Sequence, residues 1–571
     1  MNRQPASFSA NEQATLLQGY ARQRQEALLT LALGGISTVA LLWYYAQQQI
    51  LLYGDAVAHI NIARRVLDNR SWLSSFFQLG TVWLPLPHIL MLPWVWNKVL
   101  WTSGIAGSIA SMAAYVLGAL GIFRLLSARL SPTAGYFSAA IYGLNPNLLY
   151  MQTTAMNEPL YLAFFLWAVV YFDAWLRQIS SPATAADHAR PPERALEACG
   201  IAVAGGAATR YDGWFFGAIL GVLVLGVFAR WWRRTPDAAR RRRMRKSLLE
   251  FLLLNALVAV FWLAYNHRVS GRALDWANGP YSAKAIAERT TARATAPYPG
   301  KDHIITAGRY FLKAAKLNVG PGQWGNVLFA FALAGTAIAL WRFRRYWIWL
   351  LLWVPLAFYA LSVAYGSVPI FIPSWPPFSY YNVRYGLELL PVFAVFPVLL
   401  WVFLADLVAR RGKQLIVWSI LALLVVSSYV SIYADIPITL KEAQVNARTR
   451  VILQDALARF LASLPPGTTI LMYQGEHVGA LQQAGIPLRR VIGEGDHPGW
   501  EWALLDPARH AEYIIACKGD PVWMAAGEHR EDLTELLAIT VPGQAKCAVY
   551  RPSGRLIETP KTSRPLAPSP P

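Results

Sequence analysis

Long apolar runs recur along the whole chain, and they constrain its fold more than any other feature. A run of about 20 apolar residues crosses the roughly 30 Å hydrocarbon core of a bilayer as a helix. Inside lipid, such a segment must satisfy its own backbone hydrogen bonds. Hydrophobic residues make up 55% of the 571 residues, and charged residues only 15%. Runs of sufficient length cover residues 27–49, 104–126, 133–150, 158–176, 247–265, 323–341, 346–364, 385–405 and 414–432.

A further apolar stretch, residues 197–230, is too long for one helix. It is broken by Thr209-Arg210-Tyr211-Asp212-Gly213. We expect two short spans that meet at this break, which brings the total to about 11 transmembrane helices. The predicted fold class is therefore a polytopic α-helical membrane protein, with a transmembrane domain over residues 27–436.

The distribution of Lys and Arg gives the expected orientation. If the N-terminal segment 1–26 is cytoplasmic, every short inside connection is basic, as the positive-inside rule requires. The densest basic connection, residues 230–246, contains the run Arg240 to Lys246 without interleaved aromatic residues. Base stacking needs such aromatics. The net charge of +20 thus fits membrane topology, and we expect no nucleic-acid partner.

The outer side then receives two long loops, about 50–103 and 266–322, and everything after the last span. Residues 437–551 change character and alternate between helical and strand-like patterns, which is typical of a small α/β domain. Helical patterns cover 440–464, 477–483 and 532–538, and strand-like runs cover 468–473, 489–492, 512–516 and 547–550. The Pro-rich tail 552–571 is expected to be disordered. Cys517 and Cys547 either form one disulfide or remain buried thiols.

The first outer loop opens with an acid, Asp55, directly after a span. A helical pattern follows from Ala56 to Asn69, which is typical of a helix that lies in the membrane interface. Asp55 has two interpretations: it is the N-cap of that helix, or it carries chemistry at the mouth of the bundle. His59, one turn later, and His88, at the end of a proline-broken apolar segment, are candidate substrate-binding residues in the same loop.

Three further charged groups lie where spans meet the outer surface. Glu158 opens a span, where an acid also suits the helix dipole. Arg210 has Asp212 as its local partner, so it is either half of an internal salt bridge or a phosphate ligand, because guanidinium binds phosphate in a bidentate fork. Arg384 and Tyr385 precede a late span and form a second candidate phosphate site.

Together these residues resemble the GT-C glycosyltransferases, in particular the bacterial family 39 proteins related to protein mannosyltransferases and aminoarabinose transferases. The resemblance rests on Gly54-Asp55-Ala56, Asn157-Glu158-Pro159-Leu160, Thr209 to Gly213, Arg384-Tyr385 and the external C-terminal domain. It covers most of residues 27–432. The resemblance implies a location in the bacterial inner (plasma) membrane, with the C-terminal domain on the periplasmic or extracellular side.

The family implies transfer of a sugar from a polyprenyl-phosphate carrier to a lipid, glycan or protein acceptor at the outer face. Asp55 would be the general base in an inverting displacement, and Arg210 and Arg384 would stabilise the departing phosphate. Glu158 would orient the acceptor or bind a divalent cation together with Asp55. Membrane lipids and the lipid-linked donor are the expected partners.

Other functions remain open at this point. The leading alternative is a transporter or flippase of a lipid-linked or anionic substrate. Transporters carry broken or charged helices near the bilayer midplane, whereas here the candidate residues gather at the outer surface. A polymer ligase that uses lipid-diphosphate donors is a closer variant of the enzyme hypothesis.

Overall fold

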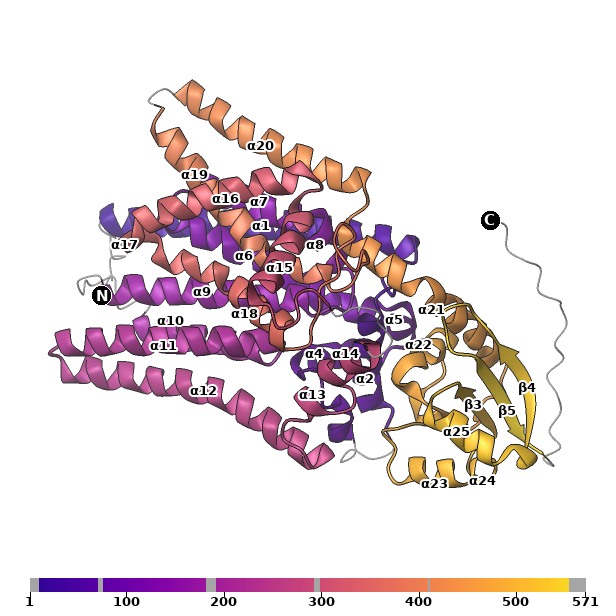
Figure 1. Cartoon of the computed structure of the whole chain (residues 1–571). Helices are drawn as coiled ribbons and strands as arrows, with labels where there is room; N and C mark the ends of the chain where they lie inside the picture. Colours follow the sequence, from indigo (N-terminus) through magenta and orange to yellow (C-terminus); the bar gives the residue numbers. More distant parts are fainter. Residues whose placement is uncertain (1–9, 70–74, 181–190, 292–297, 409–410, 554–571) are drawn as a thin grey trace, which may run out of the picture. The chain divides into compact units, whose positions relative to one another are not determined.

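The computed structural model describes residues 10–69, 75–180, 191–291, 298–408 and 411–553. The chain divides into two compact units (Figure 1). The first, called the membrane unit below, comprises residues 1–50, 81–87 and 108–443. The second, called the mixed unit, comprises residues 51–80, 88–107 and 444–571. The tail expected to be disordered lies outside the described residues from 554 onward.

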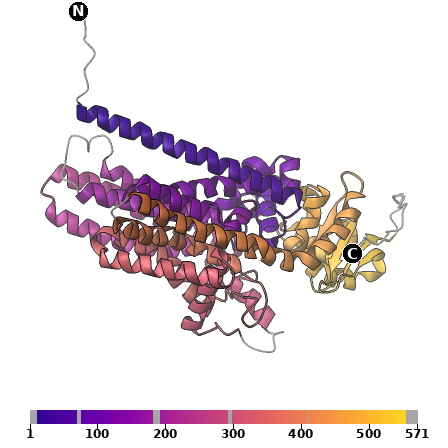
Figure 2. The same cartoon turned by 90° about the horizontal axis from the view of Figure 1, so that it is seen from above.

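The membrane unit is built from long apolar helices. Within the described residues, nine helical segments in the chain are long and apolar enough to cross a membrane, which agrees with a polytopic α-helical protein. Its long helices are α1 (Ala10–Ala46), α6 (Ile105–Ser127), α9 (Glu158–Ser180), α11 (Tyr211–Arg234), α12 (Ala238–Ser270), α16 (Gln323–Trp341), α19 (Leu390–Asp406) and α20 (Arg411–Ala434). Figure 2 shows long helices of this unit running side by side in one bundle.

Shorter helices complete this unit. They are α7 (Pro132–Gly143), α8 (Pro146–Met151), α10 (Pro192–Ala207), α13 (Asp275–Asn278), α14 (Ala283–Thr291), α15 (Ile304–Val319), α17 (Phe343–Tyr346), η3 (Trp347–Trp353), α18 (Val354–Tyr365) and η4 (Val383–Leu389). The run 133–150, expected as one span, consists of α7 and α8. The helix is interrupted at Asn145, which is the N-cap of α8. Its side chain accepts hydrogen bonds from the backbone amides of Asn147 and Leu148, and Pro146 occupies the first helical position.

The apolar stretch 197–230 does contain a break at the expected place. Helix α10 ends at Ala207, α11 begins at Tyr211, and Arg210 is the N-cap residue of α11. Helix α10 packs against α9, α11 and α12. The polar break is therefore held inside the bundle by three neighbouring helices.

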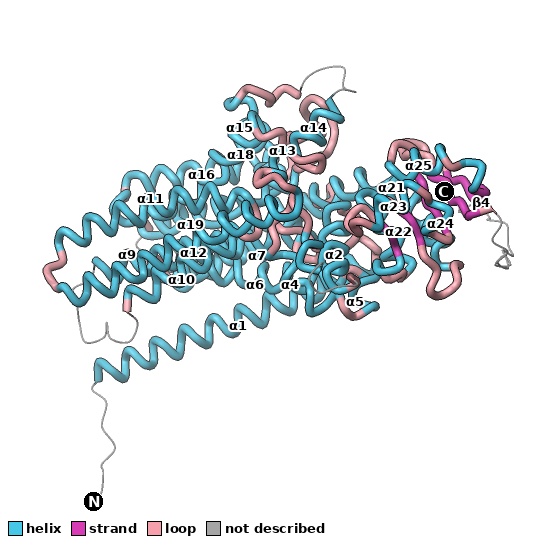
Figure 3. The backbone as a smooth tube through the Cα atoms, turned by 90° about the horizontal axis from the view of Figure 1, so that it is seen from below, coloured by secondary structure: helices cyan, strands magenta, loops and turns pink. Residues whose placement is uncertain are grey.

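The mixed unit contains the five-stranded sheet and the helices around it (Figure 3). The strand order is β2-β1-β3-β5-β4, in which β1 is parallel to β2 and β3, while β5 is antiparallel to β3 and β4. The strands are β1 (Ile470–Met472), β2 (Val491–Ile492), β3 (Tyr513–Cys517), β4 (Leu533–Ile539) and β5 (Cys547–Pro552). Buried side chains of the central strands, including Leu471, Ile514 and Ala548, form its core.

The helices of the mixed unit come from both ends of the sequence. They are α2 (Gly54–Leu67), η1 (Phe77–Leu79), α5 (Lys98–Ser103), α22 (Gln474–Ala484), η5 (Leu488–Arg490), α23 (Gly499–Leu505), α24 (Pro507–His510), α25 (Pro521–Glu528) and η6 (Arg530–Asp532). Helices α4 (Leu86–Val95) and α21 (Ile438–Ala462) cross the boundary between the units. Most of the first outer loop thus belongs to the same unit as the C-terminal sheet.

The helical pattern expected at 532–538 is wrong, because residues 533–538 belong to strand β4 and only Asp532 is helical, as the last residue of η6. The strand has a register irregularity between Glu535 and Leu537 where it pairs with β5. Such a bulge breaks the alternation of period two that identifies strands in sequence. The apolar residues Leu533, Leu536 and Leu537 consequently fall at helical spacing, although the pairing with β5 decides the structure.

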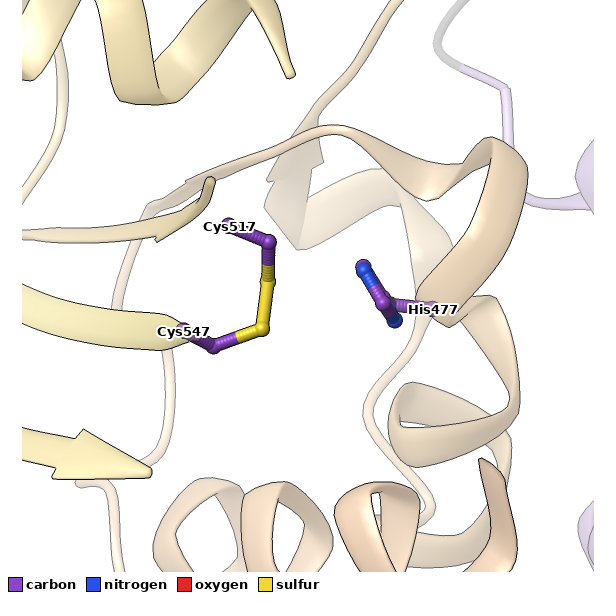
Figure 4. A group of neighbouring side chains, drawn as sticks. All are labelled: His477, Cys517 and Cys547. Carbon is purple, nitrogen blue, oxygen red and sulfur yellow. A yellow bond between two sulfur atoms is a disulfide. The ribbon is translucent and has the colours of Figure 1, made fainter. Parts of the chain in front are cut away.

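Cys517 and Cys547 form a disulfide that joins β3 to β5 at directly opposite positions. The buried His477 ring of α22 lies beside this disulfide (Figure 4). Sulfur atoms that are bonded to one another offer no thiolate, so this group is not a metal-ligand set in the disulfide form. Burial lowers the pKa of His477 below its ordinary value.

A close helix crossing gives a test of the membrane unit. Gly335 of α16 lies against α19, and a Cβ at this position would be 1.9 Å from the backbone oxygen of Phe396. Gly335→Ala is therefore expected to destabilise the protein by about 1–3 kcal/mol through overpacking. Thermal unfolding in detergent should give a lower Tm.

Gly221→Ala is the matched control, because a Cβ at Gly221 of α11 meets nothing within 4 Å. This variant should keep or slightly raise Tm, since Ala is the better helix former. Equal Tm values for the two variants would contradict the α16–α19 contact.

Candidate functional site

Arg210 lies at the centre of a buried ionic network in the membrane unit. Its Nη1 contacts Glu158 Oε1 at 3.2 Å, and its Nε contacts Asp212 Oδ2 and Glu388 Oε1, each at 3.1 Å. Its Nη2 donates to the Tyr359 hydroxyl at 2.8 Å. The internal salt bridge to Asp212 is therefore present, and two further acids share the same guanidinium.

Arg384 belongs to the same network through Glu158. Its Nε donates to Glu158 Oε1 at 3.2 Å, and its Nη1 donates to Glu442 Oε1 at 2.7 Å. Glu442 also accepts hydrogen bonds from the backbone amides of Asn382 and Arg384. The Glu158 carboxylate thus bridges the two arginines predicted from the sequence.

Two tyrosines complete the network. The single hydrogen of the Tyr359 hydroxyl has two carboxylate acceptors within reach, Glu388 Oε1 at 2.8 Å and Asp212 Oδ2 at 3.2 Å. The Tyr385 ring lies under both guanidinium groups, with Arg210 Cζ and Arg384 Cζ each 5.0 Å from its centroid. A cation over an aromatic face is stabilised by the ring quadrupole. The Tyr385 ring therefore offsets part of the repulsion between the two positively charged guanidinium groups.

Local sequence explains how these side chains reach one another. Glu158 is in the first turn of α9, Arg210 precedes α11, Arg384 lies in η4 directly before α19, and Glu442 lies in the first turns of α21. Each residue therefore sits at or near the beginning of a helical segment. Charged side chains at helix ends have room to approach one another. Side chains in the middle of a helix lack this room, because they are packed against apolar neighbours.

Formal charge in this network does not balance. Four acids, Glu158, Asp212, Glu388 and Glu442, surround the two arginines. Within the described residues, Glu158 Oε2 and Glu388 Oε2 are buried and have no hydrogen-bond partner. Divalent cations such as Mg²⁺ prefer carboxylate oxygens. In the described part of the chain, however, no three acids of this network bring ligand oxygens close enough together to hold one ion.

Asp55 belongs to the mixed unit, where it lies in the first turn of α2. The N-cap of this helix is Tyr53, so Asp55 is the second residue of the helix and not the cap residue. A negative side chain still suits the dipole in the first turn. The other face of α2 is covered by protein: Val57, Ile60 and Ala63 are buried, while Leu67 is 44% exposed.

Arg450 of α21 holds the segment that leads into Asp55. Its Nη2 donates to the backbone oxygens of Leu52 at 2.7 Å and Leu51 at 3.4 Å, and its Nη1 donates to Gln454. Its guanidinium interacts electrostatically with Asp55. Arg450 is thus placed to fix the position of the predicted catalytic acid.

His59 and His88 meet inside the mixed unit. His59 Nδ1 and His88 Nε2 are 2.8 Å apart, and both rings are buried. Burial and the neighbouring His59 lower the pKa of His88 well below its ordinary value. The two candidates from one loop therefore form a pair joined by one hydrogen bond, in which one ring nitrogen donates and the other accepts.

Comparison with known proteins identifies the fold. No protein-family model matches the sequence, and no curated protein matches it. Among solved structures, ArnT from Cupriavidus metallidurans bound to undecaprenyl phosphate matches 92% of this chain and 97% of its own, with a TM-score of 0.54 and 14% identity. Its apo form matches 90% of this chain and 97% of its own, with a TM-score of 0.52 and 12% identity. The chain has the GT-C fold.

An archaeal oligosaccharyltransferase, AglB from Archaeoglobus fulgidus, is a more distant match. It aligns with 90% of this chain and 74% of its own, at a TM-score of 0.43 and 12% identity.

The sequence-predicted site residues therefore fall into two groups within the GT-C fold. Glu158, Arg210, Asp212, Arg384 and Tyr385 lie together in the membrane unit. Asp55, His59 and His88 belong to the mixed unit.

Four residues of these groups were missed by sequence reasoning: Tyr359, Glu388, Glu442 and Arg450. Glu388 and Glu442 carry a detectable signal, since an acid within or beside an apolar run is costly unless paired. Tyr359 has no such signal among the many aromatics of the spans. Arg450 lies in a helical pattern with several exposed charges, so its role follows from its contacts alone.

Arg450→Ala tests the clamp on the Asp55 segment. Loss of the guanidinium removes the donors to Leu51 and Leu52, so the start of α2 should open more often. Hydrogen–deuterium exchange of the full chain in detergent should be faster in peptides that cover residues 51–58.

Arg448→Ala is the control, because Arg448 lies on the same helix with its side chain exposed. Exchange in residues 51–58 should not change in this variant. The same increase in both variants would mean that the positive charge of α21, and not the hydrogen bonds made by Arg450, restricts residues 51–58.

Proposed function

We propose that the chain is a membrane glycosyltransferase that moves a sugar from a polyprenyl-phosphate carrier to an acceptor on the outer face of the cytoplasmic membrane. The observation that carries this proposal is the match with ArnT, which extends over nearly the whole of both chains and whose matched structure has undecaprenyl phosphate bound. The carrier is a lipid phosphate, which suits a chain rich in membrane helices and buried guanidinium groups.

Asp55 is the proposed general base. It would take the proton from an acceptor hydroxyl while that oxygen attacks the anomeric carbon of the donor. The bond from the anomeric carbon to the phosphate oxygen breaks in the same displacement, and the carrier phosphate leaves with that electron pair. A single displacement inverts the configuration at the anomeric carbon. The clamp by Arg450 supports this role, because a base acts efficiently only when its position is fixed.

Arg210 and Arg384 are the proposed phosphate ligands, and Glu158 is the residue that holds them together. Preorganised guanidinium groups stabilise charge that develops on a leaving phosphate. A divalent cation bound at Glu158 would supply further positive charge and offset the surplus of acids. His59 and His88 are proposed to bind substrate, and Tyr385 to hold the arginines in place.

Asp55→Asn is the direct test of the proposed reaction. The amide has nearly the shape of the carboxylate but cannot accept the proton, so transfer from a polyprenyl-phosphate sugar should fall by at least about 10²-fold. The measurement is product formation by purified protein in detergent, together with the yield and Tm of the variant, which should not change.

Asp302→Asn is its control, because Asp302 is exposed and has a positive φ of 62° that Asn also adopts readily. Activity of this variant should equal that of the wild type. Full activity of Asp55→Asn would remove Asp55 from catalysis. A wild type that moves intact lipid-linked sugar between leaflets but forms no product would instead favour the flippase alternative.

Arg384→Lys tests the phosphate ligand. Lysine keeps the positive charge near Glu158 and Glu442 but loses the planar fork. A lost hydrogen bond to a charged group corresponds to about 1.5–3 kcal/mol, so the KM for the donor should rise roughly 10- to 150-fold, with the KM for the acceptor unchanged.

Arg344→Lys, at an exposed position of α17, should leave both KM values unchanged. A fall in Tm of Arg384→Lys with an unaltered KM for the donor would make Arg384 part of a purely structural ion-pair network.

A further inference from the structure

A cavity of about 380 Å³ lies in the membrane unit, away from the ionic network around Arg210. Its lining includes Arg124 near the end of α6, Arg177 near the end of α9 and Arg194 near the start of α10. Glu158 begins α9, whereas Arg177 is in its last turn. Helix α9 has 23 residues, which corresponds to roughly 34 Å. The cavity and the network therefore lie at opposite ends of a helix as long as the hydrocarbon core is thick.

Positive charge dominates the surroundings of this cavity. Glu26 is shared by two arginines, Arg22 and Arg124, with Arg124 Nη2 2.6 Å from Glu26 Oε2. Asp173 is likewise shared by two arginines, Arg129 and Arg177. Glu26 and Asp173 are thus each already bound by two guanidinium groups.

Arg194 adds to the surplus of positive charge around the cavity. Within the described residues, no carboxylate pairs with its side chain, and the neighbouring acid Glu193 is bound to Arg243. Five arginines therefore face two carboxylates, an excess of three positive charges. An anion would be attracted to this cavity.

The remaining walls are apolar, and this decides the kind of anion. They include Leu125, Val170, Ala174 and Ala195. A soluble anion gains nothing from these side chains, whereas a lipid brings a charged headgroup and an apolar body together. The cavity also lies at the ends of membrane-spanning helices, where lipid headgroups are found.

We propose that this cavity binds the phosphate headgroup of an anionic phospholipid, with Arg124, Arg177 and Arg194 as its ligands. The apolar walls contact the glycerol backbone and the beginning of the acyl chains. The site is separate from the transferase reaction proposed above, and neither proposal depends on the other.

The test uses the full chain in detergent micelles and native mass spectrometry with two lipids that share their acyl chains. Dioleoyl-phosphatidylglycerol should bind with one preferred equivalent, and dioleoyl-phosphatidylcholine should bind at least tenfold more weakly. Each arginine near a lipid surface contributes about a fivefold factor in binding. Arg177→Gln combined with Arg194→Gln should therefore weaken binding of the anionic lipid roughly 25-fold.

Arg242→Gln is the matched control, because Arg242 is an exposed arginine in the first turns of α12. It should alter lipid binding by less than twofold. A circular-dichroism melt of each variant reports folding, and a double variant with wild-type Tm and weakened binding supports the site.

Three outcomes would overturn the proposal. Equal binding of the two lipids would mean that the headgroup is not recognised. Undiminished binding by the double variant would place the lipid elsewhere. Glycerol 3-phosphate that displaces the lipid at equal concentration would identify a site for soluble phosphate, since the apolar walls would then contribute nothing.

Discussion

Mutual neutralisation of buried charges is the constraint on which the membrane unit depends. Arg210 and Arg384 are costly inside a helical bundle unless carboxylates lie beside them. Glu158 satisfies both arginines at once, and Asp212, Glu388 and Glu442 complete the pairing. Because these residues come from α9, the α10–α11 break, η4 and α21, the ion pairs fix the relative positions of helices that are far apart in sequence.

The same network also restricts how far its side chains can move. A guanidinium held by several acids has little freedom, so Arg210 and Arg384 keep fixed positions. Tyr385 beneath both arginines and Tyr359 between two acids restrict the geometry further.

In the mixed unit, the chain uses a different device to position an acid. Asp55 takes its place from α2, and the segment before α2 is fixed by Arg450, which lies almost 400 residues later in the chain. The loop that carries Asp55 therefore forms part of the same compact unit as the C-terminal sheet. Packing against α22 also buries polar residues of α2, such as Asn61, which donates to Gln482 at 2.6 Å.

Sequence patterns were most reliable where one physical force dominates. Most long apolar helices and the polar break at Arg210 follow from the bilayer's demand for apolar length and internal hydrogen bonds. About 11 spans were expected, whereas nine segments of the described residues are long and apolar enough, because α7 and α10 have only 12 and 16 residues. The β4 strand was missed because its bulge imitates helical spacing. The N-cap interpretation of Asp55 was off by two positions, because the choice between Tyr53 and Asp55 depends on backbone angles that local composition does not determine.

The sequence by itself determined the fold class, the order of the spans and the candidate residues Asp55, Glu158, Arg210 and Arg384. Only the tertiary structure decided which charges pair. It joined Arg210 to Glu388 and Tyr359, joined Arg384 to Glu442, and assigned Arg450 to the Asp55 segment. The physical reason is that an ion pair is set by distances between side chains on different helices. Those distances arise from packing, which the order of residues along one helix does not encode.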